Sequence, residues 1–183
     1  MRNFLLAMCL TLAGCASQSK QGGAGETTVV VVRHAEKSTE PPADPLLTEA
    51  GIQRAMALLE TVRAMPVGAV ISTQFARTKA TAAPVAAAFG RTVEIVDARA
   101  KEHVREVADG ILAKHRGETV VVVGHSNTVT EIVEALGAPR PPALCDGDYD
   151  NLYVVHVPAA GPATVDLRKY GAPSPTDVGC PKK

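Results

Sequence analysis

The chain is short of aromatic residues and has no net charge. Aromatic residues make up 3% of its 183 positions, tryptophan is absent, and 19 lysines and arginines balance 19 aspartates and glutamates. Such a chain lacks the long-range electrostatic field of a nucleic-acid binder or a polybasic membrane reader, so we expect no nucleic-acid partner. The hydrophobic fraction of 46% suffices for the core of one domain, and the sequence contains no internal repeat.

The apolar run near the start is too short for a transmembrane helix. Residues 4–13 form a run of about ten residues, whereas a membrane-spanning helix needs about 20. A positive charge at Arg2 precedes the run and small residues follow it, a pattern that predicts a signal peptide at residues 1–14. Residues 16–26 are polar and rich in glycine, so we expect a flexible tether before a single folded domain at residues 27–183.

The string Leu-Ala-Gly-Cys at residues 12–15 resembles the lipobox of bacterial lipoproteins. The resemblance implies export, cleavage before Cys15, lipid attached to its thiol and anchoring in a lipid bilayer. Ala16 after the lipidated residue implies, for a cell with two membranes, delivery to the outer membrane facing the periplasm. The alternative is a plain secretory signal in which Cys15 is incidental.

Cysteine is scarce, with four residues in the chain. Cys9 leaves with the predicted signal peptide and Cys15 is the predicted anchor, so Cys145 and Cys180 remain. An even pair in an exported protein favours a disulfide, which would join the C-terminal tail to the loop before Asp150. Two unrelated thiols are the alternative, because spacing along the chain says nothing of their separation in space.

The domain alternates between β-branched runs and helical periodicity. Strands are predicted at residues 27–32, 67–72, 92–96 and 119–123, with a terminal hairpin at 152–157 and 163–167. Four helices are predicted between them. The first follows an N-cap at Thr48, the second is kinked or delayed by Pro84 and ended by Gly90, and the last runs from Asn127 or Thr128 to Leu136 and is closed by Gly137. The expected core residues of the first three helices are Ile52, Ala55, Met56, Leu59 and Val62; Ala82, Val85, Ala86 and Phe89; and Val104, Val107, Ala108, Ile111 and Leu112. The alternation predicts an α/β fold, a three-layer α/β/α sandwich with a mainly parallel sheet.

Polar side chains follow three of the predicted strands at their carboxyl ends, where ligands bind in such sheets. These segments supply Arg33, His34, Arg77 and His125. A guanidinium matches phosphate oxygens and stays charged, while a neutral imidazole attacks phosphorus or donates a hydrogen bond. Two arginines and two histidines at one sheet edge therefore indicate a site for a phosphoryl group.

The same segments resemble the motifs of the histidine phosphatase superfamily, the phosphoglycerate mutase-like proteins. The similar stretches, in the family's order, are Arg33-His34-Ala35-Glu36, the Leu-Thr-x-x-Gly of residues 47–51, residues 72–82 around Arg77, and Gly124-His125. Four linked motifs spread over residues 27–170 argue against chance agreement. The resemblance implies that His34 is the nucleophile, that Arg33 and Arg77 bind phosphate, and that His125 is a further ligand that polarises the phosphoryl group.

These roles imply a phosphatase that hydrolyses phosphomonoesters, or a phosphoprotein, through a phosphohistidine on His34. No metal or other cofactor is expected, because no obvious string of metal ligands is present. The short chain resembles the small phosphatases without a lid, which implies an open site tolerant of several phosphorylated substrates.

A general acid for the leaving group is not obvious. Family members with a glutamate donor carry it in a long insertion between the second arginine and the second histidine, where this chain has little room. Acid-phosphatase relatives place His-Asp where this chain has His125-Ser126. Asp97, at a strand end, is the predicted donor, with Glu102 and Asp44 behind it, and a role as a surface carboxylate is the alternative for each.

The remaining histidines, His103, His115 and His156, are predicted to be solvated or packing residues, and Glu36 and Lys37 to be exposed loop charges. A serine-hydrolase elbow at residues 124–128 is disfavoured, because the motif needs glycine at its last position. A non-catalytic phosphate- or envelope-binding lipoprotein stays open, since a missing acid is compatible with lost turnover. A phosphoglycerate mutase-type phosphotransferase is disfavoured by export and by the missing lid.

Overall fold

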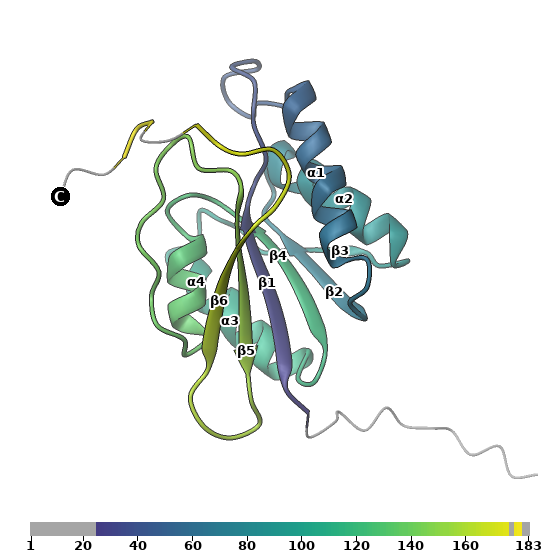
Figure 1. Ribbon diagram of the computed structural model, residues 1–183, viewed down its shortest axis with the longest axis vertical. Coiled ribbons are helices and arrows are strands. Elements are labelled where there is room, and N and C mark those ends of the chain that lie inside the picture. Colours follow the sequence, from purple (N-terminus) through teal and green to yellow (C-terminus); the bar gives the residue numbers. More distant parts are fainter. Residues whose placement is uncertain (1–24, 176–177, 181–183) are drawn as a thin grey trace, which may run out of the picture.

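Figure 1 presents the computed structural model of the chain, which describes residues 25–175 and 178–180. The predicted signal peptide, Cys9 and the predicted lipidation site Cys15 lie outside the described residues and stay predictions. Within the described part, no helix combines the length and the apolar character needed to cross a membrane. The first strand begins at Thr27, the residue at which the folded domain is predicted to start.

A six-stranded sheet forms the middle of the domain. Its strands are β1 (Thr27–Arg33), β2 (Val67–Ser72), β3 (Val93–Ile95), β4 (Thr119–Gly124), β5 (Asn151–Val157) and β6 (Thr164–Lys169), in the order β3-β2-β4-β1-β5-β6. The four strands β1 to β4 are parallel, and the hairpin of β5 and β6 adds antiparallel beside β1. The mainly parallel sheet and the terminal hairpin are confirmed.

Helices cover both faces of the sheet, as Figure 1 shows. The pair α1 (Glu49–Val62) and α2 (Ala76–Ala88) packs with Val30 and Val32 of β1. The pair α3 (His103–Lys114) and α4 (Val129–Ala135) packs on the other face with Val29 and Val31. All four valines are fully buried, because successive side chains of a covered strand point into opposite layers. The predicted three-layer sandwich is confirmed.

The two helices on the first face differ in detail from the prediction. Ile52 and Met56 of α1 are 49% and 44% exposed, so they lie outside the buried stripe that Leu58 and Leu59 follow. The apolar residues of α1 thus span a wider part of the helix surface than the part that packs on the sheet. Helix α2 starts at Ala76, with Pro84 inside it, so a late start is wrong. The Asp44 carboxylate accepts hydrogen bonds from Ala76 N and thereby fixes this early start.

The predicted disulfide joins Cys145 to Cys180, with an S–S distance of 2.04 Å. Backbone hydrogen bonds reinforce the link, since Asp146 N donates to the carbonyl of Gly179 at 3.1 Å. The disulfide thus fastens the end of the chain to the loop of residues 145–150. This loop also contacts an arginine at the carboxyl edge of the sheet.

Candidate active site

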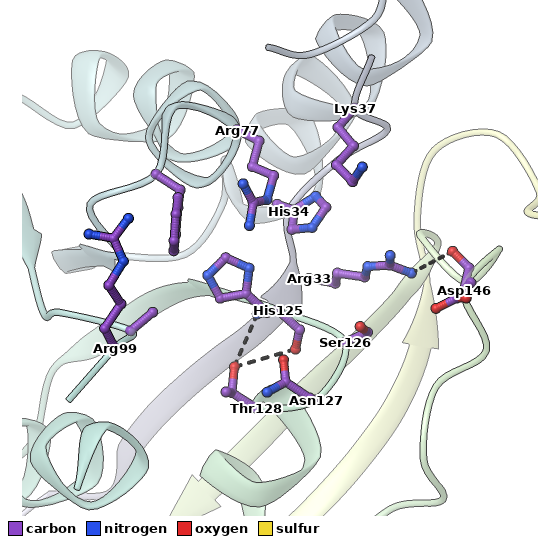
Figure 2. Close-up of a pocket in the computed structure, with 12 residues that line it drawn as sticks. Arg33, His34, Lys37, Arg77, Arg99, His125, Ser126, Asn127, Thr128 and Asp146 are labelled. Atoms are coloured by element: carbon purple, nitrogen blue, oxygen red, sulfur yellow. Dashed lines mark hydrogen bonds between the residues drawn. The ribbon is translucent and has the colours of Figure 1, made fainter. Parts of the chain in front are cut away.

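The register of the sheet brings the two predicted site histidines together. β1 and β4 are neighbours, Arg33 lies opposite Gly124, and His34 N donates to the Gly124 carbonyl at 2.9 Å. His34 and His125 directly follow these strands, so their rings face each other edge to face with centroids 5.5 Å apart. Figure 2 shows the two rings at the centre of a pocket, with Arg77 beside them.

His34 is held as a neutral imidazole of one tautomer. Its Nδ1 lies 2.8 Å from the backbone oxygen of Ala35, and because a carbonyl only accepts, Nδ1 must donate. The lone pair is then on Nε2, which has no hydrogen bond to any described residue. The side chain is 4% exposed, and burial, followed by the nearby positive charges, lowers its pKa to about 3. At neutral pH His34 therefore carries a free lone pair.

His125 is also buried and neutral. Burial, with the positive charge of Arg77 next in importance, lowers its pKa to about 4. Its Nε2 lies 3.1 Å from the hydroxyl of Thr73, which lies 2.7 Å from the hydroxyl of Thr78. Phe75 meets the ring edge to face, with centroids 5.4 Å apart. The hydroxyl pair and Phe75 fix the ring, while Nδ1 has no hydrogen-bond partner among the described residues.

Arg77 projects from the first turn of α2 toward the histidines (Figure 2). Its guanidinium lies 4.4 Å from the centre of the Phe75 ring, and its Nη1 is 3.6 Å from the Asp44 carboxylate. Burial lowers the pKa of Arg77, yet a guanidinium keeps its charge at neutral pH. Its buried Nε has no partner in the described structure, so this arginine has donors to spare for a ligand.

Arg33 also binds the backbone of the loop after Cys145, in addition to its predicted contact with phosphate. Its Nη1 donates to the backbone oxygens of the disulfide-bonded loop, at 3.3, 2.8 and 3.1 Å for Cys145, Asp146 and Asp148. The guanidinium also stacks 4.2 Å from the centre of the Tyr149 ring. Burial lowers its pKa, and the buried Nε has no partner in the described part of the chain. Arg33 therefore ties the loop to the phosphoryl site and contributes charge there.

The motif Leu-Thr-x-x-Gly has a structural explanation in the loop after His34. Thr48 N and its hydroxyl both contact the backbone oxygen of Glu36, and the same hydroxyl caps α1 at Gly51 N. A Cβ at Gly51 would collide with that Glu36 oxygen. Glu36 is not the exposed loop charge of the prediction, because its carboxylate is paired at 2.7 Å with Arg54, whose side chain is 3% exposed. The loop that carries His34 is thus clamped to α1.

The site pocket has a volume of about 410 Å³, within the range of small-molecule sites. It is lined by Arg33, His34, Lys37, Phe75, Arg77, Ala98, Arg99, His125, Ser126, Asn127, Thr128 and Asp146. The predicted nucleophile His34 and the three predicted phosphate ligands all line it. Sequence reasoning missed Phe75, Arg99 and Asp146 and misjudged Lys37, which is exposed as predicted but lines the pocket. The rule that polar residues follow strand ends could have found Arg99, which lies shortly after β3.

The three carboxylates proposed as general acids do not line the pocket. Asp97 is exposed, and its Oδ1 accepts from Gln74 Nε2 at 2.5 Å and from Arg99 N at 2.9 Å. Glu102 is exposed at the start of α3, and Asp44 caps α2 beside Arg77. The placement of Asp97 does not support the predicted role, because its oxygen is already committed to the loop of residues 97–99.

The other three histidines lie outside the pocket. His103 is 4% exposed and packs in the core. His115 lies between two carboxylates, 3.1 Å from Glu94, and His156 is 2.8 Å from Glu26. These two are thus paired rather than merely solvated. Among the described residues, no group of three or more histidine, cysteine, aspartate or glutamate side chains is arranged to hold a metal ion.

The comparison with protein families agrees with this geometry. The sequence pattern of the histidine phosphatase superfamily (branch 1) matches residues 29–103, which contain Arg33, His34 and Arg77. The match spans less than half of the chain and makes it similar to this superfamily over that stretch. The matched stretch ends before His125, and the fold places that residue beside the others. No curated protein sequence matches the chain.

Several solved structures share the fold of this chain. The protein histidine phosphatase SixA, in complex with tungstate, is 18% identical, with 78% of this chain and 96% of that chain covered and a TM-score of 0.62. The mycobacterial glucosyl-3-phosphoglycerate phosphatase, in complex with VO3, is 14% identical, with 80% and 99% covered and a TM-score of 0.58. YhfR of Bacillus stearothermophilus is 20% identical, with 78% and 96% covered and a TM-score of 0.56. At identities this low, the likeness shows a shared fold alone.

Proposed function

We propose that this protein is a phosphatase that hydrolyses phosphomonoesters through a phosphohistidine on His34. The observation that carries the proposal is the meeting of two neutral, buried imidazoles with two guanidiniums at the carboxyl edge of a parallel sheet. Two structural relatives were solved with tungstate and with VO3, which resemble phosphate as oxyanions. That likeness supports a phosphoryl ligand for the same edge of this sheet.

The reaction begins with His34 as the nucleophile. Its Nδ1 proton is held by the Ala35 carbonyl, so Nε2 attacks phosphorus without first losing a proton. The Nε2–P bond forms while the bond from phosphorus to the leaving oxygen breaks, and the leaving group takes up a proton. Water then attacks phosphorus and returns a proton to the group that protonated the leaving oxygen, the Nε2–P bond breaks, and inorganic phosphate leaves with His34 neutral again.

Arg77 and His125 stabilise the oxygens of the phosphoryl group as charge moves through the transition state. Arg77 offers its unpartnered Nε and the rest of its fork. When the Thr73 hydroxyl donates to Nε2 of His125, Nδ1 carries the proton and donates to a phosphoryl oxygen. Removing one such donor typically costs about 10²–10³-fold in turnover, so Arg77→Ala should fall in that range.

Asp146 replaces Asp97 as the candidate proton donor. It is the one carboxylate among the described residues that line the pocket. A positioned acid contributes about 10²–10⁴-fold for a poor leaving group and little for a good one. Asp146→Asn should therefore slow alkyl phosphates strongly and 4-nitrophenyl phosphate weakly. Glu102→Gln is the matched control, because Glu102 is exposed and does not line the pocket. A selective loss on alkyl phosphates in Asp97→Asn would restore Asp97 as the donor.

The cellular setting belongs to the proposal as well. The lipobox-like string supports an exported lipoprotein, anchored in the bilayer through acylated Cys15 and, in a cell with two membranes, on the periplasmic face of the outer membrane. Cys15→Ala should release the protein from membranes into the soluble fraction. A mutant that still sediments with membranes after a salt wash would contradict the lipid anchor.

Steady-state hydrolysis of phenyl phosphate by the purified domain tests the proposed function. Wild-type protein should release phosphate, and His34→Ala should reduce the rate by about 10³-fold or more, because the nucleophile cannot be replaced by a neighbour. Phosphate binding without any turnover in the wild-type protein would instead support a non-catalytic phosphate-binding lipoprotein.

A further inference from the structure

The pocket contains more positive charge than the proposed reaction uses. Lys37 and Arg99 line it in addition to the two arginines that face the phosphoryl group, against the single carboxylate of Asp146 among the described lining residues. The chain as a whole is neutral, so this excess is local. In Figure 2, Arg99 lies on the opposite side of His125 from Arg33.

The backbone at Arg99 is held by hydrogen bonds, and no carboxylate of a described residue pairs with its guanidinium. Its guanidinium lies 5.2 Å from the centre of the Phe75 ring. Its backbone N donates to Asp97 Oδ1, whose carboxylate is in turn held by Gln74. Gln74 Oε1 also accepts from Ala98 N at 2.9 Å. The Asp97 carboxylate thus shapes the loop that presents Arg99.

Several exposed arginines outside the pocket are neutralised by carboxylates, although exposed Arg91 and Arg116 form no ion pair with a described residue. Arg63 pairs with Glu60, Arg105 with Asp109, and Arg140 with Glu131 and Glu134. Arg99 forms no ion pair with any described residue, although it is exposed and points to a pocket. An unpaired guanidinium at the rim of a concave site is suited to bind an anion.

We propose that Arg99, stacked on Phe75, forms a second anion site beside the phosphoryl site, and that the substrate is a small phosphomonoester whose leaving group carries another acidic group. This inference rests on the proposed function and specifies its substrate class. The cavity of about 410 Å³ has room for a phosphoryl group and a small leaving group. A carboxylate and a second phosphate share the chemistry that Arg99 recognises.

Three aryl phosphates test the second anion site. Phenyl phosphate has a neutral leaving group, 3-carboxyphenyl phosphate adds a carboxylate, and 1,3-phenylene bisphosphate adds a phosphate. The readout is the preference, defined as kcat/KM for an anionic ester divided by kcat/KM for phenyl phosphate. Differences in leaving-group chemistry cancel when the preference of a variant is compared with that of the wild type.

Arg99→Gln should lower the preference for at least one anionic ester about fivefold, which is the effect of losing an exposed charge pair of about 1 kcal/mol. The ester that loses its advantage identifies the acidic group. Lys101→Gln is the matched control, because Lys101 is an exposed cation two residues away that does not line the pocket. Its preference should equal that of the wild type. The wild-type preference should also weaken as salt is raised.

An unchanged preference for both anionic esters in Arg99→Gln would overturn the second anion site while leaving the proposed function intact. The second anion site would also be overturned if the wild-type protein hydrolysed a phosphorylated protein faster than all three esters and Arg99→Gln did not change that rate. If the wild-type protein hydrolyses none of the three esters and no phosphoprotein, the proposed function fails, and the second anion site falls with it.

Discussion

The two site histidines should make the folded protein less stable as the pH falls. Burial lowers the pKa of His34 to about 3 and that of His125 to about 4, from 6.5 for an unperturbed histidine. Between those values and pH 6.5, the unfolded chain binds protons that the folded site does not. The stability that the neutral histidines contribute is therefore complete above about pH 6.5 and is lost as the pH falls toward 4.

The size of the loss follows from the pKa shifts. Each unit of difference corresponds to about 1.4 kcal/mol, and the linkage relation gives a fall in the free energy of unfolding of about 3 kcal/mol for His34 between about pH 7 and pH 4.5. His34→Gln removes the titrating group and should flatten the pH dependence by about that amount. His156→Gln on β5 makes the same substitution outside the pocket and should leave the His34 contribution in place.

Urea unfolding followed by far-UV circular dichroism provides the assay. Wild-type protein, His34→Gln and His156→Gln would be unfolded at several values between about pH 7 and pH 4.5, with the disulfide intact. The reasoning predicts a shallower slope of unfolding free energy against pH for His34→Gln than for the other two. Parallel slopes for all three proteins would refute the claim that His34 is kept neutral by its surroundings.

Three further outcomes are expected. Glu36→Gln should lower the free energy of unfolding by about 2–3 kcal/mol in a urea titration, because buried Arg54 loses its carboxylate, and an unchanged midpoint would show that the pair is dispensable. Cys145→Ala should cost about 3–4 kcal/mol, since it opens a covalent loop with a sequence separation of 35, and should also lower kcat/KM because the loop that holds Arg33 loosens. Cys180→Ala breaks the same bond and should behave alike, so a large difference between the two variants would argue against the disulfide as the cause. Activity should survive EDTA, because guanidiniums supply the positive charge that a metal supplies elsewhere; loss in EDTA that a divalent ion restores would contradict this.

The layers of the fold and the centre of the site could be predicted because their signals are local. The β-branched runs predicted the strands β1 and β4, which His34 and His125 directly follow, while the structure supplies the pairing of the two strands. Gly90 and Gly137 end their helices as predicted, with positive φ angles of 59° and 92° that favour glycine. The even cysteine pair also predicted the disulfide between Cys145 and Cys180.

The rim of the site could not be predicted because it depends on contacts between distant segments. Asp97 lies at a strand end as an acid should, but Gln74, 23 positions away, holds its carboxylate in the loop instead. Arg99 becomes part of the pocket because its guanidinium stacks on Phe75. Glu36 resembles a loop charge in the sequence, and its partner on α1 is apparent only in the folded chain.

The central claim is that His34 carries the phosphoryl group during turnover, and trapping of the adduct tests it most directly. Native enzyme would be mixed with a radiolabelled phenyl phosphate, quenched within the first turnover, digested and mapped by mass spectrometry under alkaline conditions. The account predicts an acid-labile phosphoryl adduct on His34 that is absent in His34→Ala. An adduct on Ser126, which lines the same pocket, or normal turnover by His34→Ala would contradict it.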